Sequence, residues 1–339
     1  MNDDVVISSY LKRNLIKIIA LIIALILIIM LFFIDIFVGS ANLTFKETLS
    51  AIFAPNNVSS SIVLIVRELR IPIALMAILI GLSLGTSGSV MQTILHNPLA
   101  SPYTLGIGAG ASFGATIAIL FQANDFVVAA LAFIFAMVIS LLIFFIGKFK
   151  KISTHTMTLL GIAFLFFFKA LQSFVQYFAS EDQNQSIVFW EFGSLQKVDY
   201  QKVLILLTAF IIIFPLLMRN SWKYTSLSLG DMKAESLGVN TSKLKLESFI
   251  LISILSALSV CFTGPIGFIG IASPHIARLI SGDDHRFFLP LSALIGAFIL
   301  LLADIISKVI MPGAIFPIGI ITSLIGVPFF FVVLIKEKH

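Results

Sequence analysis

Nine long apolar runs follow one another along the 339 residues of this chain, and they limit its fold more than any other feature. Each run is close to the roughly 20 residues that an α-helix needs to cross the hydrocarbon core of a bilayer. We therefore expect an all-α integral membrane protein. The runs cover about residues 15–38, 71–94, 104–121, 126–147, 157–178, 203–218, 247–265, 288–310 and 318–335.

The composition excludes a soluble enzyme. Hydrophobic residues make up 59% of the chain and charged residues 12%, against roughly 45–50% and about 25% in soluble domains. The single cysteine, Cys261, excludes an intrachain disulfide and a multi-thiolate metal site. The chain has no G-x-x-x-x-G-K-S/T phosphate loop, so any ATP must be bound by another chain. We expect no cofactor and no metal.

The net charge of +5 indicates topology, and we expect no nucleic-acid partner, because Lys and Arg fall mostly in short loops. Basic residues stand at both ends of the chain: Lys12, Arg13 and Lys17 near the start, and Lys336 and Lys338 after the last run. Since cytoplasmic segments are enriched in Lys and Arg, both termini are predicted to be cytoplasmic. An even number of spans is then required.

A short segment at about residues 268–280 supplies the missing crossing. Gly264 and Pro265 separate it from the preceding run, and as a helix it would be only about 15–20 Å long. Other helices must bury the ends of so short a span. We expect about ten spans in a single transmembrane domain, 1–339, with an outer loop at 179–200 and a cytoplasmic loop at 219–245.

Two arginines interrupt the hydropathy pattern at the outer edge of the second span. Arg67 and Arg70 are three residues apart and share one helix face. They are either interfacial arginines that snorkel to water or a docking site for an acidic partner. Because they run against the positive-inside bias, we favour docking.

The segment from His96 to Gly106 forces a turn between two spans. Pro98 and Pro102 end one helix, and Gly106 with the glycines that follow lets the next helix pack closely on a neighbour. The G-x-G-x-G spacing is no nucleotide fingerprint, because no strand precedes it.

The cytoplasmic loop contains a glycine-bracketed helix of about two turns, which is too short to be stable alone and too polar to span. It is either an ordinary loop helix or a socket for a cytoplasmic partner, and we favour the socket. Its residues are Leu229, Gly230, Asp231, Ala234, Leu237, Gly238 and Val239.

A fourth segment packs glycine, proline, histidine and arginine so densely that it suggests a broken, re-entered helix. Asp284 with Arg286 is expected to form a helix cap, and the histidines lack a third zinc ligand. No catalytic cluster emerges, because Asp35 and Asp304 are isolated acids in different spans. The motif residues are Gly264, Pro265, Gly267, Gly270, Pro274, His275, Arg278, Asp284, His285 and Arg286.

Taken together, these segments closely resemble the FecCD/BtuC family, the permease subunits of ABC importers for iron-siderophores, haem and vitamin B12. The resemblance runs from about residue 66 to 334. It rests on HNPLASPYTLG, GPIGFIGIASPHIAR, GDDHRFFLP, LLLADIISK and FPIGIITSLIGVPFF. It implies a type II ABC importer permease fold of ten helices in the bacterial cytoplasmic membrane, with both termini cytoplasmic.

The resemblance also implies partners: a cytoplasmic ATPase dimer, an extracytoplasmic substrate-binding lipoprotein and a second permease subunit. It assigns binding-protein docking to Arg67, Arg70 and Lys308. It assigns ATPase coupling to the glycine-bracketed helix. The implied gate at the cytoplasmic mouth consists of Asn97, Leu99, Ser153 and Thr154. The corresponding family motif is R-x-P-R, and this chain has Leu69 in place of the proline. Both arginines of the motif are present.

The implied function is a non-enzymatic permease for an iron-siderophore or similar metal chelate. Haem, cobalamin or an oxyanion such as molybdate is an alternative cargo. An ion-coupled secondary transporter is the alternative of another class, and it needs buried carboxylates, for which Asp304 is the sole mid-helix candidate. A membrane enzyme would need an acid, base or metal cluster, and we find none in the sequence.

Overall fold

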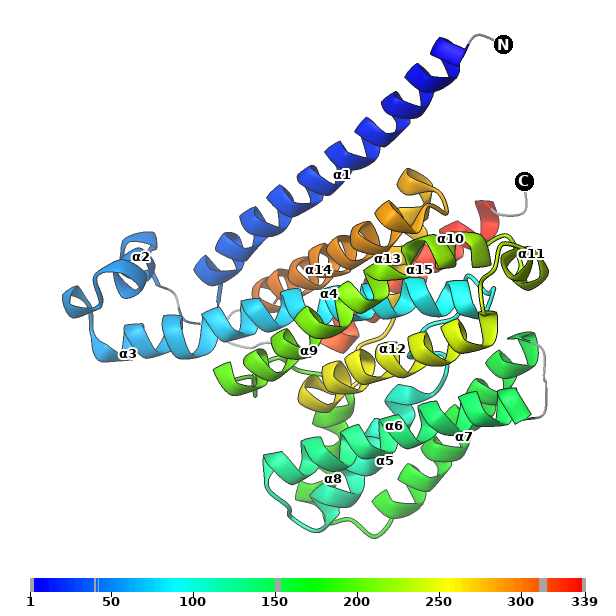
Figure 1. Ribbon diagram of the computed structural model, residues 1–339. Coiled ribbons are helices and arrows are strands. Elements are labelled where there is room, and N and C mark those ends of the chain that lie inside the picture. The colour runs from blue at the N-terminus through cyan, green and yellow to red at the C-terminus, as the bar shows by residue number, and fades with distance from the viewer. Residues whose placement is uncertain (1–2, 40, 42, 150–153, 311–315, 337–339) are drawn as a thin grey trace.

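The computed structural model describes residues 3–39, 41, 43–149, 154–310 and 316–336, and within these ranges the regular secondary structure is entirely helical. In Figure 1 the first turn of α1 and the last turn of α15 lie at the same end of the bundle as α10 and α11. We call this the inner end, because the charge distribution predicts it to be cytoplasmic. The opposite end, where α2 and α3 lie, is the outer end.

The long helices coincide with the predicted spans. They are α1 (Asp3–Phe37), α4 (Ile71–Ile94), α5 (Ile107–Leu120), α6 (Asp125–Phe149), α7 (Thr154–Gln176), α9 (Tyr200–Arg219), α12 (Thr241–Thr263), α14 (His285–Val309) and α15 (Ile318–Lys336). The short crossing predicted at 268–280 is α13 (Ile269–Ser281). Six helices in the described ranges, α1, α6, α7, α9, α12 and α14, are long and apolar enough to cross a membrane. The count of ten spans stays a prediction.

Short elements connect these helices. They are α2 (Phe45–Phe53), η1 (Pro55–Asn57), α3 (Ser60–Val63), the π-helical η2 (Leu64–Arg70), α8 (Glu181–Glu191), α10 (Ser221–Leu227) and α11 (Asp231–Ser236). Helix α8 lies within the predicted outer loop at 179–200. A capping box starts it, because Ser180 and Gln183 each bond the other's backbone N–H.

Helix α4 is the centre of the bundle, and most of its residues are buried. Glycines on α4 let its neighbours approach until backbones touch. A Cβ added at Gly81 would meet the backbone of Ala297 on α14, and one added at Gly88 would meet the carbonyl of Gly270 on α13. Since lipid provides no hydrophobic force between helices, such close packing of small residues is what holds membrane helices together.

We predict that Gly88→Ala destabilises the fold, because the new methyl group has no room against the α13 backbone. Overpacking of this kind costs about 1–3 kcal/mol. The matched control is Gly267→Ala, whose Cβ would find only ordinary contacts, about 3.8 Å from the ring of Tyr103. Thermal unfolding of the purified variants in detergent should show a lower midpoint for Gly88→Ala alone; equal midpoints would contradict this packing.

Candidate functional site

The inner end carries a short exposed helix, α11, with apolar side chains that the chain itself does not cover. Leu229, Met232 and Leu237 are 58%, 85% and 64% exposed, whereas Ala234 on the same segment is completely buried. Gly230 and Gly238 bracket the helix with φ of +104° and +82°, a conformation that costs little only for glycine. The segment therefore has one anchored side and one apolar side that faces away from the bundle.

Asp231, the first residue of α11, ties the helix to two other elements. Its carboxylate lies 2.7 Å from Lys245 Nζ on α12 and 2.9 Å from His96 Nε2 in the loop after α4. Partial burial raises the pKa of this carboxyl, but the hydrogen bonds from Lys245 and His96 outweigh burial and hold the pKa below its ordinary value. A displacement of α11 would therefore pull on both neighbours.

The loop between α4 and α5 continues this connection to α7. Asn97 Nδ2 donates to Thr158 Oγ1 on α7 at 3.0 Å, and Asn97 Oδ1 accepts from the N–H of Leu99 at 2.9 Å. Gly106, with φ of +75°, starts α5. Two of the predicted gate residues, Asn97 and Leu99, thus lie next to the start of α7. Thr154 is the first residue of α7, and Ser153 lies outside the described residues.

The two outer arginines, which we predict to dock a binding protein, also close helix ends within the chain. Arg67 donates to the carbonyls of Ala51 (2.8 Å) and Ile52 (2.6 Å) at the end of α2. Arg70 is buried and donates to three carbonyls at the end of α1. These carbonyls belong to Ile36, Phe37 and Ala41. A helix end has unpaired carbonyls, and a guanidinium with five donors satisfies several of them at once.

Lys308, the third residue that the resemblance assigns to docking, is buried. Its Nζ lies 2.8 Å from Asp35 Oδ1 on α1 and 2.7 Å from Asp304 Oδ2 one turn back on α14. The interpretation of Asp35 and Asp304 as isolated acids was therefore wrong. Asp304 and Lys308 are four apart on one helix face, a signal present in the sequence, whereas no local signal brings Asp35 to them.

The fourth motif segment links three helices at the inner end. Asp284 caps α14, and its carboxylate accepts from the backbone and guanidinium of Arg286. His285 is buried, with Nε2 2.7 Å from Thr93 Oγ1 on α4. Arg278 pairs with Asp283 at 3.0 Å. In the described ranges no three His, Cys, Asp or Glu side chains gather as a metal site.

The remaining motif residues shape the backbone at the start of α13. Gly264, with φ of +77°, ends α12 beside the carbonyl of Trp190, too close for any side chain. Gly270 packs against Pro102 of the α4–α5 loop. Pro274 lies inside α13, as does His275, which is partly buried. The segment is thus broken before α13, as the transporter-type pattern indicates.

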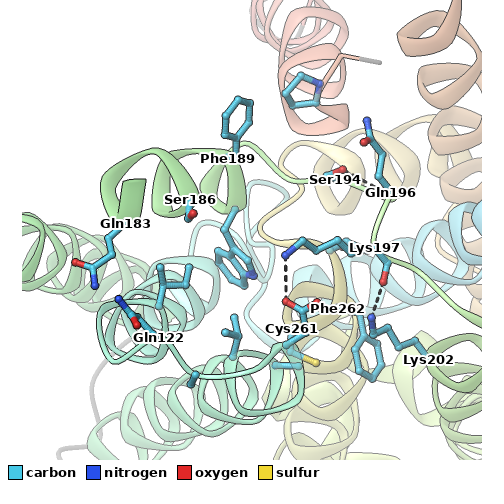
Figure 2. Close-up of a pocket in the computed structure, with 18 of the residues that line it drawn as sticks. Gln122, Gln183, Ser186, Phe189, Ser194, Gln196, Lys197, Lys202, Cys261 and Phe262 are labelled. Atoms are coloured by element: carbon cyan, nitrogen blue, oxygen red, sulfur yellow. Dashed lines mark hydrogen bonds and ion pairs between the residues drawn. The ribbon is translucent and has the colours of Figure 1, made fainter. Parts of the chain in front are cut away.

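A cavity of about 840 Å³ with polar and apolar side chains in its walls opens at the outer end between α8 and the segment before α9. Figure 2 shows Gln183 and Ser186 of α8 on one side and Lys197 and Lys202 on the other. Lys197 Nζ lies 3.0 Å from a carboxylate oxygen of Asp125, and both side chains are exposed. This pair joins the outer start of α6 to the segment before α9 and contributes little stability, because exposed ion pairs are weak.

A family model described as the FecCD transport family matches residues 25–336. The "Probable iron chelatin transport system permease protein" of Helicobacter pylori is 38% identical over 286 residues, covering 84% of this chain and 87% of that protein. The molybdate import system permease protein of Haemophilus influenzae is 34% identical over 277 residues, covering 81% and 82%.

A solved structure of similar fold covers nearly the whole chain. It is described as a metal-chelate type ABC transporter in an inward-facing conformation. It superposes with a TM-score of 0.83 at 30% sequence identity, and the match covers 93% of this chain and 98% of that one.

We predict that Lys308→Met strongly destabilises the chain, because it leaves the carboxylates of Asp35 and Asp304 buried without their cation. Breaking a buried ion pair costs about 3–5 kcal/mol. Lys197→Met is the control, because the Lys197–Asp125 pair is exposed and its loss costs about 1 kcal/mol or less. Thermal melting measures both; an unchanged midpoint for Lys308→Met would show that the buried cluster contributes no stability.

Proposed function

The chain belongs to the FecCD transport family, and we propose that it is the membrane-spanning permease of an ATP-driven importer for an iron chelate. The observation that carries the proposal is α11. Three apolar side chains stand exposed on this segment at the inner end, while an ion-pair system fixes its base to α12 and the α4–α5 loop.

Helix α11 has the properties of a docking element for a separate ATPase. It has six residues, and so short a helix is not stable by itself in water. It persists here because Ala234 and Asp231 anchor it to the bundle. Exposed apolar groups rimmed by charge mark protein–protein contacts, and Lys233 and Glu235 are exposed on the same helix. Two ATPase subunits would then engage two permeases.

Motion of α11 would reach the transport pathway through the hydrogen bonds already described. Asp231 binds His96, and the neighbouring Asn97 binds Thr158 on α7. A pull on α11 would therefore move the α4–α5 loop and the inner end of α7 together. These are the elements at which we place the gate, formed by Asn97, Leu99, Ser153 and Thr154. Alternating access of this kind needs two discrete packings of the bundle.

A substrate-binding protein would dock at the outer end, with steering that weakens as salt increases. Of the three predicted docking charges, Arg67 keeps a partly exposed position. Arg70 and Lys308 would contribute indirectly. They hold the ends of α1 and α14 in place, and these ends would form the docking surface. Acidic side chains of the binding protein would therefore meet Arg67 first.

The cargo assignment follows from the relatives. One relative is named for iron chelatin and a structural relative is a metal-chelate type transporter. The molybdate permease among the relatives makes an oxyanion the alternative cargo. In either case the chain would act in the bacterial cytoplasmic membrane beside a second permease subunit, identical or paralogous.

We predict that Met232→Glu releases the ATPase, because a carboxylate would replace the most exposed apolar side chain of α11. Co-purification from cells that produce both chains should fall about tenfold or more, the loss expected for removal of an interface hot spot. The expression level and melting midpoint of the chain should stay unchanged, since the Met232 side chain is 85% exposed.

The control is Lys243→Glu, an exposed change in the same cytoplasmic loop but outside α11. It should leave ATPase recovery at the wild-type level. If wild-type chain recovers no ATPase, or if Met232→Glu recovers as much as wild type, then α11 is not the coupling element.

A further inference from the structure

Lys169 is a charged residue within the candidate span Thr156–Gln176 of α7. It stands seven residues before the outer end of that span, which corresponds to about 10 Å along a helix. Ionisable side chains at such a depth are rare and usually mark a pathway or a relay. No sequence motif singled out this residue, because one lysine does not interrupt the hydropathy of its run.

Helix α8 brings a partner to Lys169. The capping box at Ser180 starts α8 at the outer end, and the helix carries Glu191 back toward the bundle, where its carboxylate pairs with the Lys169 ammonium. Gln172, one turn further along α7, donates from Nε2 to the other carboxylate oxygen of Glu191 at 3.3 Å.

The cluster has hydrogen-bonding capacity to spare. Lys169 is 49% exposed, and an ammonium has three donors, of which Glu191 takes one. Gln172 is completely buried, and its Oε1 has no hydrogen-bond partner. A buried amide oxygen without a partner is costly unless a ligand or water meets it. The spare donors of Lys169 are therefore open to a ligand, while the unpaired Oε1 of Gln172 lies buried beside Glu191.

These side chains line a cavity of about 930 Å³ whose other walls come from α5, α15 and the segment before α13. Most of that wall is apolar or small, with Phe166 and Phe192 on one part and Gly108 and Gly319 on others. An apolar cavity of this size with a few convergent polar groups is typical of a small-molecule site.

We propose that Lys169, Gln172 and Glu191 form a cargo-contact site for an anionic, oxygen-rich metal chelate; the proposal rests on the proposed transport function. The Lys169 ammonium binds a negatively charged oxygen of the chelate, and Gln172 holds the Glu191 carboxylate beside that lysine through its Nε2 hydrogen bond. Glu191 holds the lysine in place and neutralises it when no cargo is present. The apolar walls accommodate the carbon frame of the chelate.

A purely structural ion pair between α7 and α8 is the competing explanation, and two substitutions separate the two. Lys169→Met removes the cation that the chelate would bind. Glu191→Gln keeps a hydrogen-bond acceptor for Lys169 but removes the carboxylate that neutralises the Lys169 ammonium. If the pair only joins the helices, both changes act alike; if Lys169 binds cargo, only the first abolishes binding.

The test is equilibrium dialysis of radiolabelled Fe(III)-citrate against the full chain in lipid nanodiscs. We expect saturable binding by wild type and at least about tenfold weaker binding by Lys169→Met, the effect of losing one charge-assisted hydrogen bond. Glu191→Gln should bind at least as well as wild type, and Lys169→Arg should retain binding. Lys197→Met, which removes an exposed lysine outside this cavity, is the control.

No saturable binding by wild type, or equal binding by Lys169→Met, would overturn the site. Full displacement by molybdate at equal concentration would overturn its assignment to chelates. The proposed function fails separately: a chain that recovers no ATPase but shows Lys169-dependent binding keeps the site and loses the ATP-driven role. A chain that recovers ATPase but shows no Lys169-dependent binding keeps the ATP-driven role and loses the site.

Discussion

Backbone contact between α4 and its neighbours is the constraint on which the rest of the structure depends. Glycines on α4 bring α13 and α14 so close that no Cβ fits between them, and in lipid such packing replaces the hydrophobic force that joins helices in water. The same helix continues from η2, which holds Arg67 and Arg70, and ends beside His96, which contacts α11. One continuous helical element thus links the outer helix ends to α11 at the inner end.

Charge in this chain has two separate uses. Inside the bundle, Arg70 and the Asp35–Lys308–Asp304 cluster tie α1 to η2 and α14, and their burial makes them structural. At the inner end, Asp231 sets the position of α11 while leaving its apolar side chains free. The buried charges thus lie toward the outer end, whereas the exposed apolar side chains of the α11 segment lie at the inner end.

Much of the fold was predictable because long apolar runs, glycine brackets and a charge bias are local signals. The span at 71–94, the short helix α13 and the bracketed α11 all followed from them. The contacts that depend on tertiary packing did not. Asp35 meets Lys308 across 273 positions, and Glu191 meets Lys169 only because α8 folds back. Helix α8 had a sequence signal in its S-x-x-Q capping box, whereas the burial of Arg70 had none.

The most direct test of the central claim is the energy source of transport. The chain would be reconstituted in proteoliposomes with its ATPase and binding protein, and accumulation of the radiolabelled chelate would be measured with and without ATP, and with an uncoupler that collapses ion gradients. Accumulation should stop without ATP and persist with the uncoupler. Accumulation that continues when the ATPase is omitted, or that the uncoupler abolishes while ATP remains, would contradict an ATP-driven permease and favour an ion-coupled transporter.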